Sequence, residues 1–426
     1  MNPPGGLARK LGLWELTLSG VGIIFGAGIY ALIGVAAGQA GNAVWLSFVL
    51  SAAVALFTAL SYAELSSMYP RVGAEYEYTA EAAGESLAFV VGWLIIFSGI
   101  VAVAAVALGF ANYFSALTGA PVIPAAALLL GAIMALLLLG IRESTFVAVI
   151  FTLIEAGGLL LIIIAGIPFL GSVDYLEMPL GFPGVFSAAA LVFFAFLGFE
   201  EIVKFSEETV SPEKTVPKAL LIALSLCTVV YILVSISAVS VIGWEGLAAS
   251  DAPFNAVAVA VWGEAGAFAL SVIALFATAN TVLLLLLAAS RISYGMARSG
   301  TLPRPLSRVH PTRQTPFVAI IAVTLTSFFF LFLGDIGVVA NVTNFTLFVT
   351  FGVVNGAVIC LRLKSPSMPR PFTIPGAILA VPVIPVLGIL SCAFLFLQLT
   401  IEVIAIGGLL TFAGGIAALF AGRRTG

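Results

Sequence analysis

Long apolar stretches without a charged residue alternate with short polar segments along the whole chain. Asp, Glu, Lys and Arg are absent from runs 16–63, 86–141, 219–244, 265–290, 314–334, 336–361, 371–401 and 403–422. A membrane-spanning helix needs about 20 apolar residues, so the longest of these runs can fold back as helical pairs. Strands of an outer-membrane barrel would alternate apolar and polar residues, whereas these runs are continuously apolar and therefore predict helices.

With the stretches 144–170 and 182–203 added, the pattern predicts an all-α polytopic membrane protein with about twelve spans. They are placed at 13–37, 44–67, 87–116, 121–140, 145–169, 182–203, 218–242, 265–291, 316–333, 336–361, 376–397 and 401–421. Composition agrees, because 62% of the residues are hydrophobic and only 9% are charged, against about 25% charged in soluble domains. The lipid bilayer is the solvent that can take up so much apolar surface.

The 17 Lys and Arg residues all fall in loops, tails or helix ends on one side of the predicted bundle. The loops on the other side hold acids such as Asp174, Glu177 and Asp335. The positive-inside rule then predicts that both termini are cytoplasmic. The apolar run after Arg9 and Lys10 is too long for a signal peptide, which indicates a retained first span. Short tails without targeting appendages favour the plasma membrane.

The first span contains a cluster of glycines between Ser19 and Ile29. Four lie within nine residues, at 20, 22, 26 and 28, and each costs a helix up to about 1 kcal/mol relative to alanine. Unwound backbone at membrane depth presents free N–H groups to an anion and free C=O groups to a cation. The cluster therefore predicts a site for a zwitterion. The alternative is that small residues only permit close helix packing.

A second break is predicted in the sixth span, where the apolar LVFFAFLG is followed abruptly by acidic residues. Gly198 corresponds to Gly26 if spans 1–5 and 6–10 are two structural repeats, and interrupted helices at matching places point to a transporter site. Glu200 is expected to hold the unwound segment in place or to take part in proton movement. Three phenylalanines precede the break and either wall a pocket or pack in the core: Phe193, Phe194 and Phe196.

Motifs in a fixed order resemble those of the amino acid–polyamine–organocation (APC) superfamily. SGVGIIFGAGIY looks like the first-helix signature, and FFAFLGFE followed by EETVSPEKTVPKAL resembles the sixth helix and its loop. ELSSMYPRVGAEYEY, SRISYGMARSGTLP and LRLKSPSMPRPF resemble further signatures after spans 2, 8 and 10. The resemblance implies a 5+5 inverted-repeat, leucine-transporter-like core with discontinuous helices 1 and 6. A single transporter domain would contain repeats at 13–169 and 182–361 and two additional helices at 376–421.

Carried over residue by residue, the resemblance places a substrate at the two breaks. A carboxylate would rest on backbone N–H groups of span 1 and an ammonium on C=O groups of both breaks. Phe194 stands where relatives place an aromatic ring over the substrate. The predicted substrate-binding residues are Ser19, Gly22, Ile23, Gly26, Ala27, Gly28, Phe194, Ala195, Phe196 and Leu197.

Glu155 lies close to the middle of span 5 and is the only acid predicted at mid-membrane. A charge there costs about 3 kcal/mol on insertion scales, so burial favours the neutral carboxyl. Proton-coupled relatives have a lysine at about this point and sodium-coupled relatives bind sodium there, so glutamate departs from the pattern. Three interpretations stay open: a proton carrier, which is favoured, a ligand for a cation such as sodium, or a structural residue. Polar residues of span 8 are its expected partners: Thr278, Asn280 and Thr281.

The leading hypothesis is a secondary active amino-acid transporter, proton-coupled through Glu155, in which apolar pocket walls favour neutral or hydrophobic substrates. One alternative is an exchanger of amino acids or polyamines without proton coupling. Another is a non-transporting amino-acid sensor on the same scaffold, for which the short tails leave no signalling appendage. The exact substrate, symport against exchange, and the oligomeric state stay open.

Composition argues against several other classes. The single histidine, His310, cannot build a zinc site or a Ser-His triad, so an intramembrane enzyme is disfavoured. The chain has no GxxxxGK[ST] motif for ATP-driven pumping, and a net charge of −3 argues against a nucleic-acid partner. We expect no cofactor and no metal. Three cysteines without CxxC spacing are interpreted as small core residues: Cys227, Cys360 and Cys392.

Overall fold

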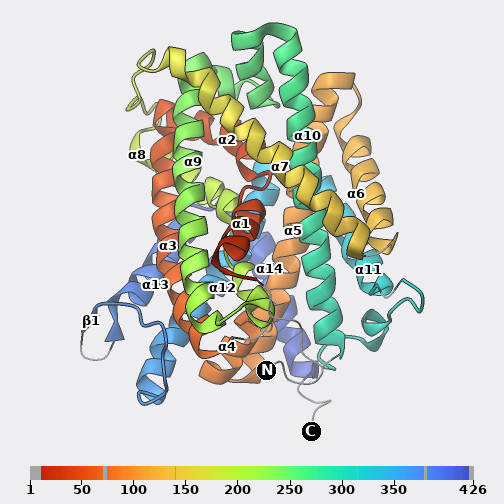
Figure 1. Ribbon diagram of the computed structural model, residues 1–426, viewed down its shortest axis with the longest axis vertical. Coiled ribbons are helices and arrows are strands. Elements are labelled where there is room, and N and C mark those ends of the chain that lie inside the picture. Colours follow the sequence, from red (N-terminus) through yellow and green to blue (C-terminus); the bar gives the residue numbers. More distant parts are fainter. Residues whose placement is uncertain are drawn as a thin grey trace.

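A computed structural model of the chain describes residues 11–70, 74–139, 141–298, 300–313, 315–378 and 381–421, and only the backbone of 141–149, 207, 420 and 421. Both predicted cytoplasmic tails, 1–10 and 422–426, lie outside these residues. The described chain is an elongated bundle of helices (Figure 1). It contains eight helices long and apolar enough to cross a membrane and four shorter apolar helices.

The first half of the bundle contains the elements of the first five predicted spans. They are α1 (Leu13–Ile24), α2 (Gly28–Ala40), η1 (Gly41–Ala43), α3 (Val44–Met68), α4 (Ala74–Ala83), α5 (Glu85–Thr118), α6 (Val122–Leu139), α7 (Ile141–Gly166) and η2 (Ile167–Phe169). Here η denotes a short 3₁₀-helix, which is common at helix ends and in connections.

The second half continues with seven further α-helices and a short hairpin. The elements are α8 (Gly181–Val192), η3 (Phe193–Phe196), η4 (Ile202–Glu208), α9 (Pro212–Ala248), α10 (Pro253–Arg298), η5 (Arg304–Ser307), α11 (Phe317–Phe330), η6 (Leu331–Leu333), α12 (Ile336–Lys364), β1 (Ala377–Ile378), β2 (Val381–Pro382), α13 (Val383–Phe396) and α14 (Ile401–Ala421). Each predicted span contains one α-helix, apart from span 1, which contains α1 and α2, and spans 5, 6 and 9 also contain 3₁₀-helices. This arrangement confirms the all-α polytopic class. The grouping into two five-helix repeats stays a prediction.

Several segments between the predicted spans have regular structure of their own. Residues 74–83 form α4, which apolarity could not predict because the helix is half polar. Helices α9 and α10 run past their predicted spans and change direction at Gly243 (φ 68°) and Gly263 (φ 66°), where glycine alone adopts positive φ readily. Span 11 begins as a helix only at Val383, because residues 377–382 form an antiparallel hairpin first.

Helix α5 lies at the centre of the bundle and packs against α10, α12 and α6. Its middle segment, 101–107, consists only of alanine and valine and is completely buried. Without a hydrophobic driving force between helices in lipid, small residues of this kind let backbones approach closely and gain dispersion contacts. Around this core, α3 packs against α9 and α8, and α1 packs against α9 (Figure 1).

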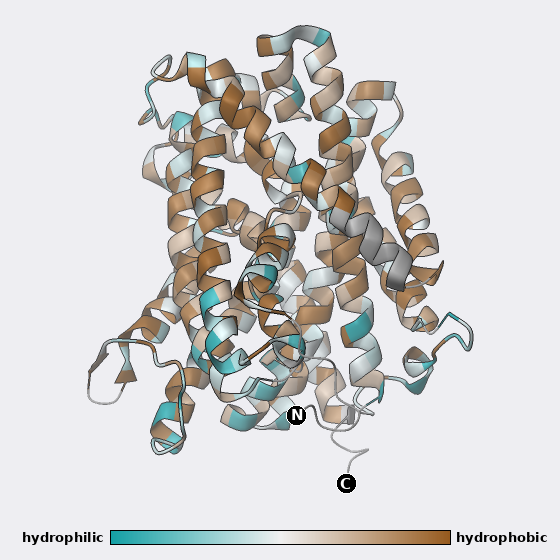
Figure 2. Cartoon of the chain, viewed as in Figure 1, coloured by the Kyte–Doolittle hydropathy of each residue, from teal (hydrophilic) through white to brown (hydrophobic). Residues whose placement is uncertain are grey.

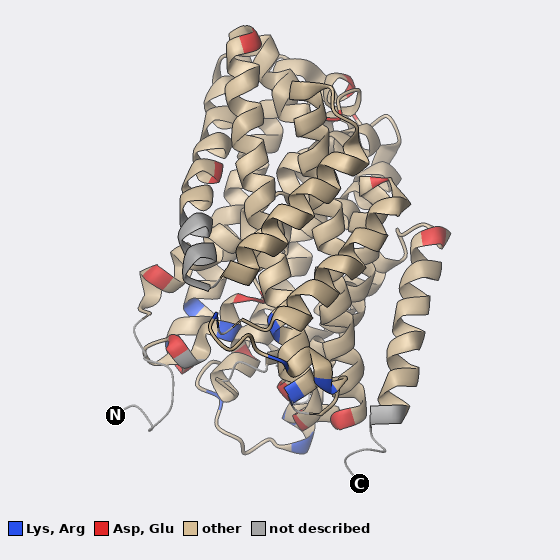
Figure 3. Ribbon diagram, turned by 90° about the vertical axis from the view of Figure 1, so that its right-hand side faces the viewer, with Lys and Arg blue, Asp and Glu red and all other residues tan. Residues whose placement is uncertain are grey.

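Hydropathy and charge divide the bundle into zones. Apolar residues dominate its body, and hydrophilic residues gather toward the end where α4 lies (Figure 2). The coloured Lys and Arg residues gather at that same end, whereas acids occur at both ends (Figure 3). The one-sided distribution of basic residues is therefore a property of the folded bundle as well as of the sequence.

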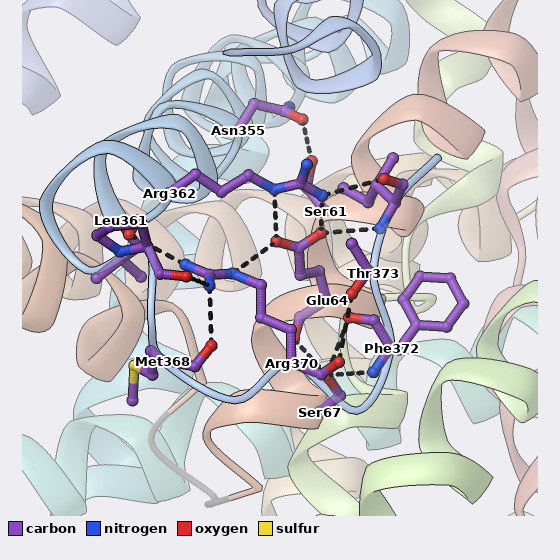
Figure 4. A network of polar contacts seen from close by, with 12 residues as sticks. Ser61, Glu64, Ser67, Asn355, Leu361, Arg362, Met368, Arg370, Phe372 and Thr373 are labelled. Atoms are coloured by element: carbon purple, nitrogen blue, oxygen red, sulfur yellow. Dashed lines mark hydrogen bonds and ion pairs between the residues drawn. The ribbon is translucent and has the colours of Figure 1, made fainter. Parts of the chain in front are cut away.

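A buried ionic network joins α3, α12 and the segment after α12 (Figure 4). Glu64 is 1% exposed and accepts hydrogen bonds from Arg362 Nε at 2.9 Å and from the Ile374 N–H at 2.9 Å. Arg362 Nη2 also pairs with the second carboxylate oxygen, and Arg370 Nε lies 3.4 Å from the first. Sequence reasoning missed this network because its members are about 300 positions apart.

We expect Glu64→Gln to lower the free energy of unfolding by about 3–5 kcal/mol, because removing one charge of a buried pair leaves its partners uncompensated. Arg362 and Arg370 would then share a neutral amide. Thermal unfolding of the protein in detergent measures the effect. The matched control is Glu402→Gln, since Glu402 is exposed at the start of α14; equal loss of stability in both variants would contradict the prediction.

Candidate functional site

The break in span 1 is narrower than the predicted 19–29, because only Phe25, Gly26 and Ala27 separate α1 from α2. The Ala27 N–H donates to Thr281 Oγ1 at 2.8 Å. Within the described chain, no acceptor is found for the N–H groups of Gly26 or Ile29. These groups lie at the start of α2, where the helix dipole adds a partial positive charge. The break is therefore suited to an anion.

The break in span 6 follows η3 and turns at Leu197–Glu201 before η4 begins. Gly198 has φ +109°, a conformation that side chains rarely adopt. The Glu200 carboxylate accepts a hydrogen bond from the Gly198 N–H at 2.9 Å. Glu200 thus contacts the turn directly, and its role, structural or in proton movement, stays a prediction.

The two breaks pack against each other through glycines. A Cβ atom on Gly28 would lie 2.5 Å from Ala195 Cα, and one on Gly198 would lie 2.6 Å from Ile23 Cγ2 and 3.0 Å from the Ile23 carbonyl oxygen. Backbone of one broken helix therefore touches backbone of the other. Unwinding and close packing, which the sequence offered as alternatives, occur together at this junction.

Tyr231 on α9 connects both breaks. Its hydroxyl lies 2.5 Å from the Ile24 carbonyl oxygen and 3.0 Å from the Ala195 carbonyl oxygen. The ring packs against Phe48 and Phe196, with centroid distances of 5.8 and 5.4 Å. Sequence reasoning missed this residue. The available signal was the single tyrosine of this span, because a buried phenol needs a hydrogen-bond acceptor.

The free carbonyl groups lie beside the free N–H groups. No described residue donates to the carbonyl oxygens of Ile23 or Leu197, whereas that of Phe194 accepts from the Leu197 N–H at 3.3 Å. Ile23 adjoins Gly198 in space, as its close approach shows. Acceptors from both helices therefore occur at the same junction as the donors of span 1.

The other predicted substrate-binding residues occupy different surroundings. The Ser19 hydroxyl donates to the Glu15 carbonyl of its own helix and is exposed. Gly22 faces span 5, since a Cβ there would lie 2.7 Å from Thr152 Cγ2. Phe194 and Phe196 are buried, at 4% and 0% exposure. Phe196 packs against Tyr231 and therefore lies at the junction of the two breaks.

Glu155 on α7 is completely buried, and neither of its carboxyl oxygens has a hydrogen-bond partner among the described residues. The side chain of Asn280 on α10 is its polar neighbour, and Asn280 Oδ1 also has no partner there. An ionised carboxylate without donors is far costlier to bury than a neutral carboxyl.

The three polar residues predicted on span 8 have three different environments. Asn280 Nδ2 donates to Thr152 Oγ1 at 3.0 Å, which links α10 to α7 one turn from Glu155. Thr281 reaches the break in span 1, as described above. Thr278 donates to carbonyl oxygens of its own helix, including that of Ala274 at 2.7 Å. Only Asn280 thus lies beside Glu155.

A second polar cluster lies at the basic end of the bundle. Tyr62 donates to Glu75 Oε1 at 3.0 Å, which ties α3 to α4. Burial raises the pKa of the Glu75 carboxyl above its ordinary value, while the nearby Lys204 ammonium opposes this shift. Lys204 also pairs with Glu201 just after the second break. The cluster holds α4 close to the segment that leaves the junction.

Two helices interrupted within a polytopic bundle, with unpaired backbone donors and acceptors meeting at the interruption, are typical of a secondary membrane transporter. The sequence model of the family described as "Amino acid permease" matches residues 11–419. The chain belongs to this family. Membership confirms the resemblance drawn from the motifs and assigns amino-acid transport, rather than enzyme catalysis, as the class of function.

Curated relatives agree with this assignment. The chain is 38% identical to the branched-chain amino acid permease BcaP of Bacillus subtilis, over 92% of this chain and 88% of the relative. It is 35% identical to the methylthioribose transporter of Bacillus subtilis, over 92% and 89% of the two chains. It is 32% identical to the vacuolar cationic amino acid transporter 2 of Arabidopsis thaliana, over 85% of this chain and 61% of the relative.

Proposed function

We propose that this chain transports neutral, apolar amino acids across the plasma membrane by alternating access, coupled to a proton on Glu155. The observation that carries the proposal is the junction of the two broken helices. It offers unpaired N–H groups at Gly26 and Ile29 next to unpaired carbonyls at Ile23 and Leu197. An amino acid presents one carboxylate and one ammonium, which match these two sets.

The α-amino and α-carboxyl groups would be held by backbone alone. The carboxylate would accept from the free N–H groups at the positive end of α2, and charge-assisted hydrogen bonds of this type are stronger than neutral ones. The ammonium would donate to the free carbonyls of both breaks. Recognition by backbone leaves the substrate side chain to be selected by its surroundings.

Apolar surroundings support a neutral side chain. Phe25, Phe194 and Phe196 flank the breaks, and no described Lys or Arg occurs in them. One relative is named for branched-chain amino acids, which fits such a wall. A cationic substrate is the second candidate, supported by the unpartnered Glu155 carboxyl and by a relative named for cationic amino acids.

Charge at the ends supports the orientation. Basic residues gather at the end where α4 lies (Figure 3), and by the positive-inside rule that end would face the cytoplasm. The break in span 1 then separates α2, which is mostly buried, from α1, whose Trp14 and Leu18 are 65% and 66% exposed.

Uptake into proteoliposomes tests the proposed function. We expect labelled leucine to accumulate when the medium is more acidic than the lumen, and to equilibrate without accumulation when the pH gradient is dissipated. Labelled arginine in the same assay tests the second candidate, and sodium replaced by choline tests sodium coupling. Absence of uptake for all twenty amino acids would contradict the proposal.

A further inference from the structure

Two side-chain hydroxyls form hydrogen bonds with backbone groups at the junction. These are the kinds of hydrogen bond that the charged groups of a bound zwitterion would form there. Thr281 Oγ1 on α10 accepts from the Ala27 N–H at 2.8 Å, as a carboxylate oxygen would. The Tyr231 hydroxyl on α9 lies between the Ile24 and Ala195 carbonyl oxygens, at 2.5 and 3.0 Å, as an ammonium would. The first is an acceptor on span 1, and the second is a donor between both breaks.

The hydrogen positions support these roles. Thr281 donates its single hydroxyl proton to the Ala277 carbonyl at 3.1 Å, so toward Ala27 it can act only as an acceptor. Tyr231 has one hydroxyl proton and faces two carbonyls, so it can act toward them only as a donor. Ala27 and Tyr231 are fully buried, where an unpaired backbone group would be costly.

We propose that Thr281 and Tyr231 are specificity-determining residues, which substitute for the substrate carboxylate and ammonium and are exchanged for them on binding. This inference rests on the proposed function. Exchange would keep the Ala27 N–H and the Ile24 and Ala195 carbonyls paired before and after binding. A ligand that carries only one of the two charged groups could displace only one hydroxyl.

Under this exchange, the affinity for the substrate depends on a difference in free energy. The hydrogen bonds that the substrate forms with the backbone are gained, and those that the two hydroxyls formed with it are lost. A variant that lacks one hydroxyl leaves its backbone group unpaired before binding, so the substrate gains that hydrogen bond without displacing another. A net hydrogen bond corresponds to about a threefold to tenfold change in Kd. The opposite expectation holds if the hydroxyls contact the substrate themselves, because their loss would then weaken binding.

The test measures Kd for labelled L-leucine on the purified full chain and on Thr281→Val and Tyr231→Phe. We expect each variant to bind leucine about threefold to tenfold more tightly than the unaltered chain. Thr278→Val is the matched control for the first variant, because the Thr278 hydroxyl bonds within its own helix. Thr281→Ser keeps the hydroxyl and should restore the original Kd.

Two truncated ligands assign each hydroxyl to its group. 3-Methylbutylamine is leucine without the carboxylate, and 4-methylpentanoate is leucine without the ammonium. In displacement of labelled leucine, Thr281→Val should improve only 4-methylpentanoate, and Tyr231→Phe should improve only 3-methylbutylamine. A purely structural role predicts the same change, or none, for both ligands.

The outcomes separate this inference from the function beneath it. Failure of the unaltered chain to bind any amino acid would overturn both. Leucine binding that is weakened or unchanged in Thr281→Val and Tyr231→Phe, with monodisperse folded protein, would overturn the inference alone. If Thr281→Val does not fold, Thr281→Ala tests the role of the Thr281 hydroxyl with 4-methylpentanoate. If one of the two sites tolerates no substitution, the folded variant at the other site still tests its own hydroxyl with the matching truncated ligand.

Discussion

Leucine accumulation driven by a pH gradient is expected to fall at least about tenfold in Glu155→Gln, because glutamine cannot bind and release a proton at this depth. Leucine–leucine exchange should stay within about twofold, since the amide is isosteric and the free backbone groups at the junction are unchanged. Glu155 is buried and has no described donor, so its neutral form is the one that the bundle accommodates. The glutamine variant imitates that form permanently.

Contacts around Glu155 connect it to the first break. The Tyr30 hydroxyl on α2 donates to the Glu155 backbone carbonyl at 2.7 Å, and Tyr113 on α5 donates to the Tyr30 carbonyl at 2.9 Å. Helix α2 begins immediately after the break, at Gly28. A change of charge on Glu155 therefore acts on a helix that is hydrogen-bonded to the start of α2.

Proteoliposome uptake and counterflow measure the two activities separately. Glu402→Gln removes an exposed carboxylate on α14 and is expected to leave both unchanged. Uptake by Glu155→Gln with the pH dependence of the unaltered chain would exclude Glu155 as the proton carrier. Sodium-driven uptake that disappears in the variant would instead identify the carboxylate as a cation ligand.

The sequence was informative where one local property decides the structure. Continuous apolarity located the spans, and the cost of glycine in a helix located both breaks. The sequence pattern overestimated the length of the first break, since Ser19 and Gly22 remain helical within α1. Helix α4 and the hairpin before α13 were missed because the prediction followed apolarity, and these segments are polar or interrupted by proline.

Features that depend on distant partners could not be predicted. Glu64 carries no local signal of a special role in the sequence, yet it pairs with Arg362 almost 300 positions away. Tyr231 was not identified as part of the site, because its significance lies in two carbonyls on other helices. One amino-acid sequence, considered without an alignment of relatives, shows residue types and spacing, but it does not show which helices are neighbours.

Transport is expected to fall by about a hundredfold in Gly28→Ala, because a methyl group there meets backbone that cannot move aside without separating the breaks. The added Cβ would lie 2.5 Å from Ala195 Cα and 3.0 Å from the Ala195 nitrogen. Relief of these contacts would separate the two helices and displace the N–H groups from the carbonyls opposite. An error of about 1 Å in such a site can cost about a hundredfold in rate.

Gly157→Ala is the matched control, since Gly157 also lies within a membrane helix and a Cβ there meets nothing within 4 Å. Alanine should stabilise that helix by up to about 1 kcal/mol and leave uptake unchanged. Leucine uptake, normalised to the amount of folded protein in the liposomes, distinguishes lost transport from lost protein. If Gly28→Ala transports as well as Gly157→Ala, the breaks do not need direct backbone contact, and the substrate must be recognised elsewhere in the bundle.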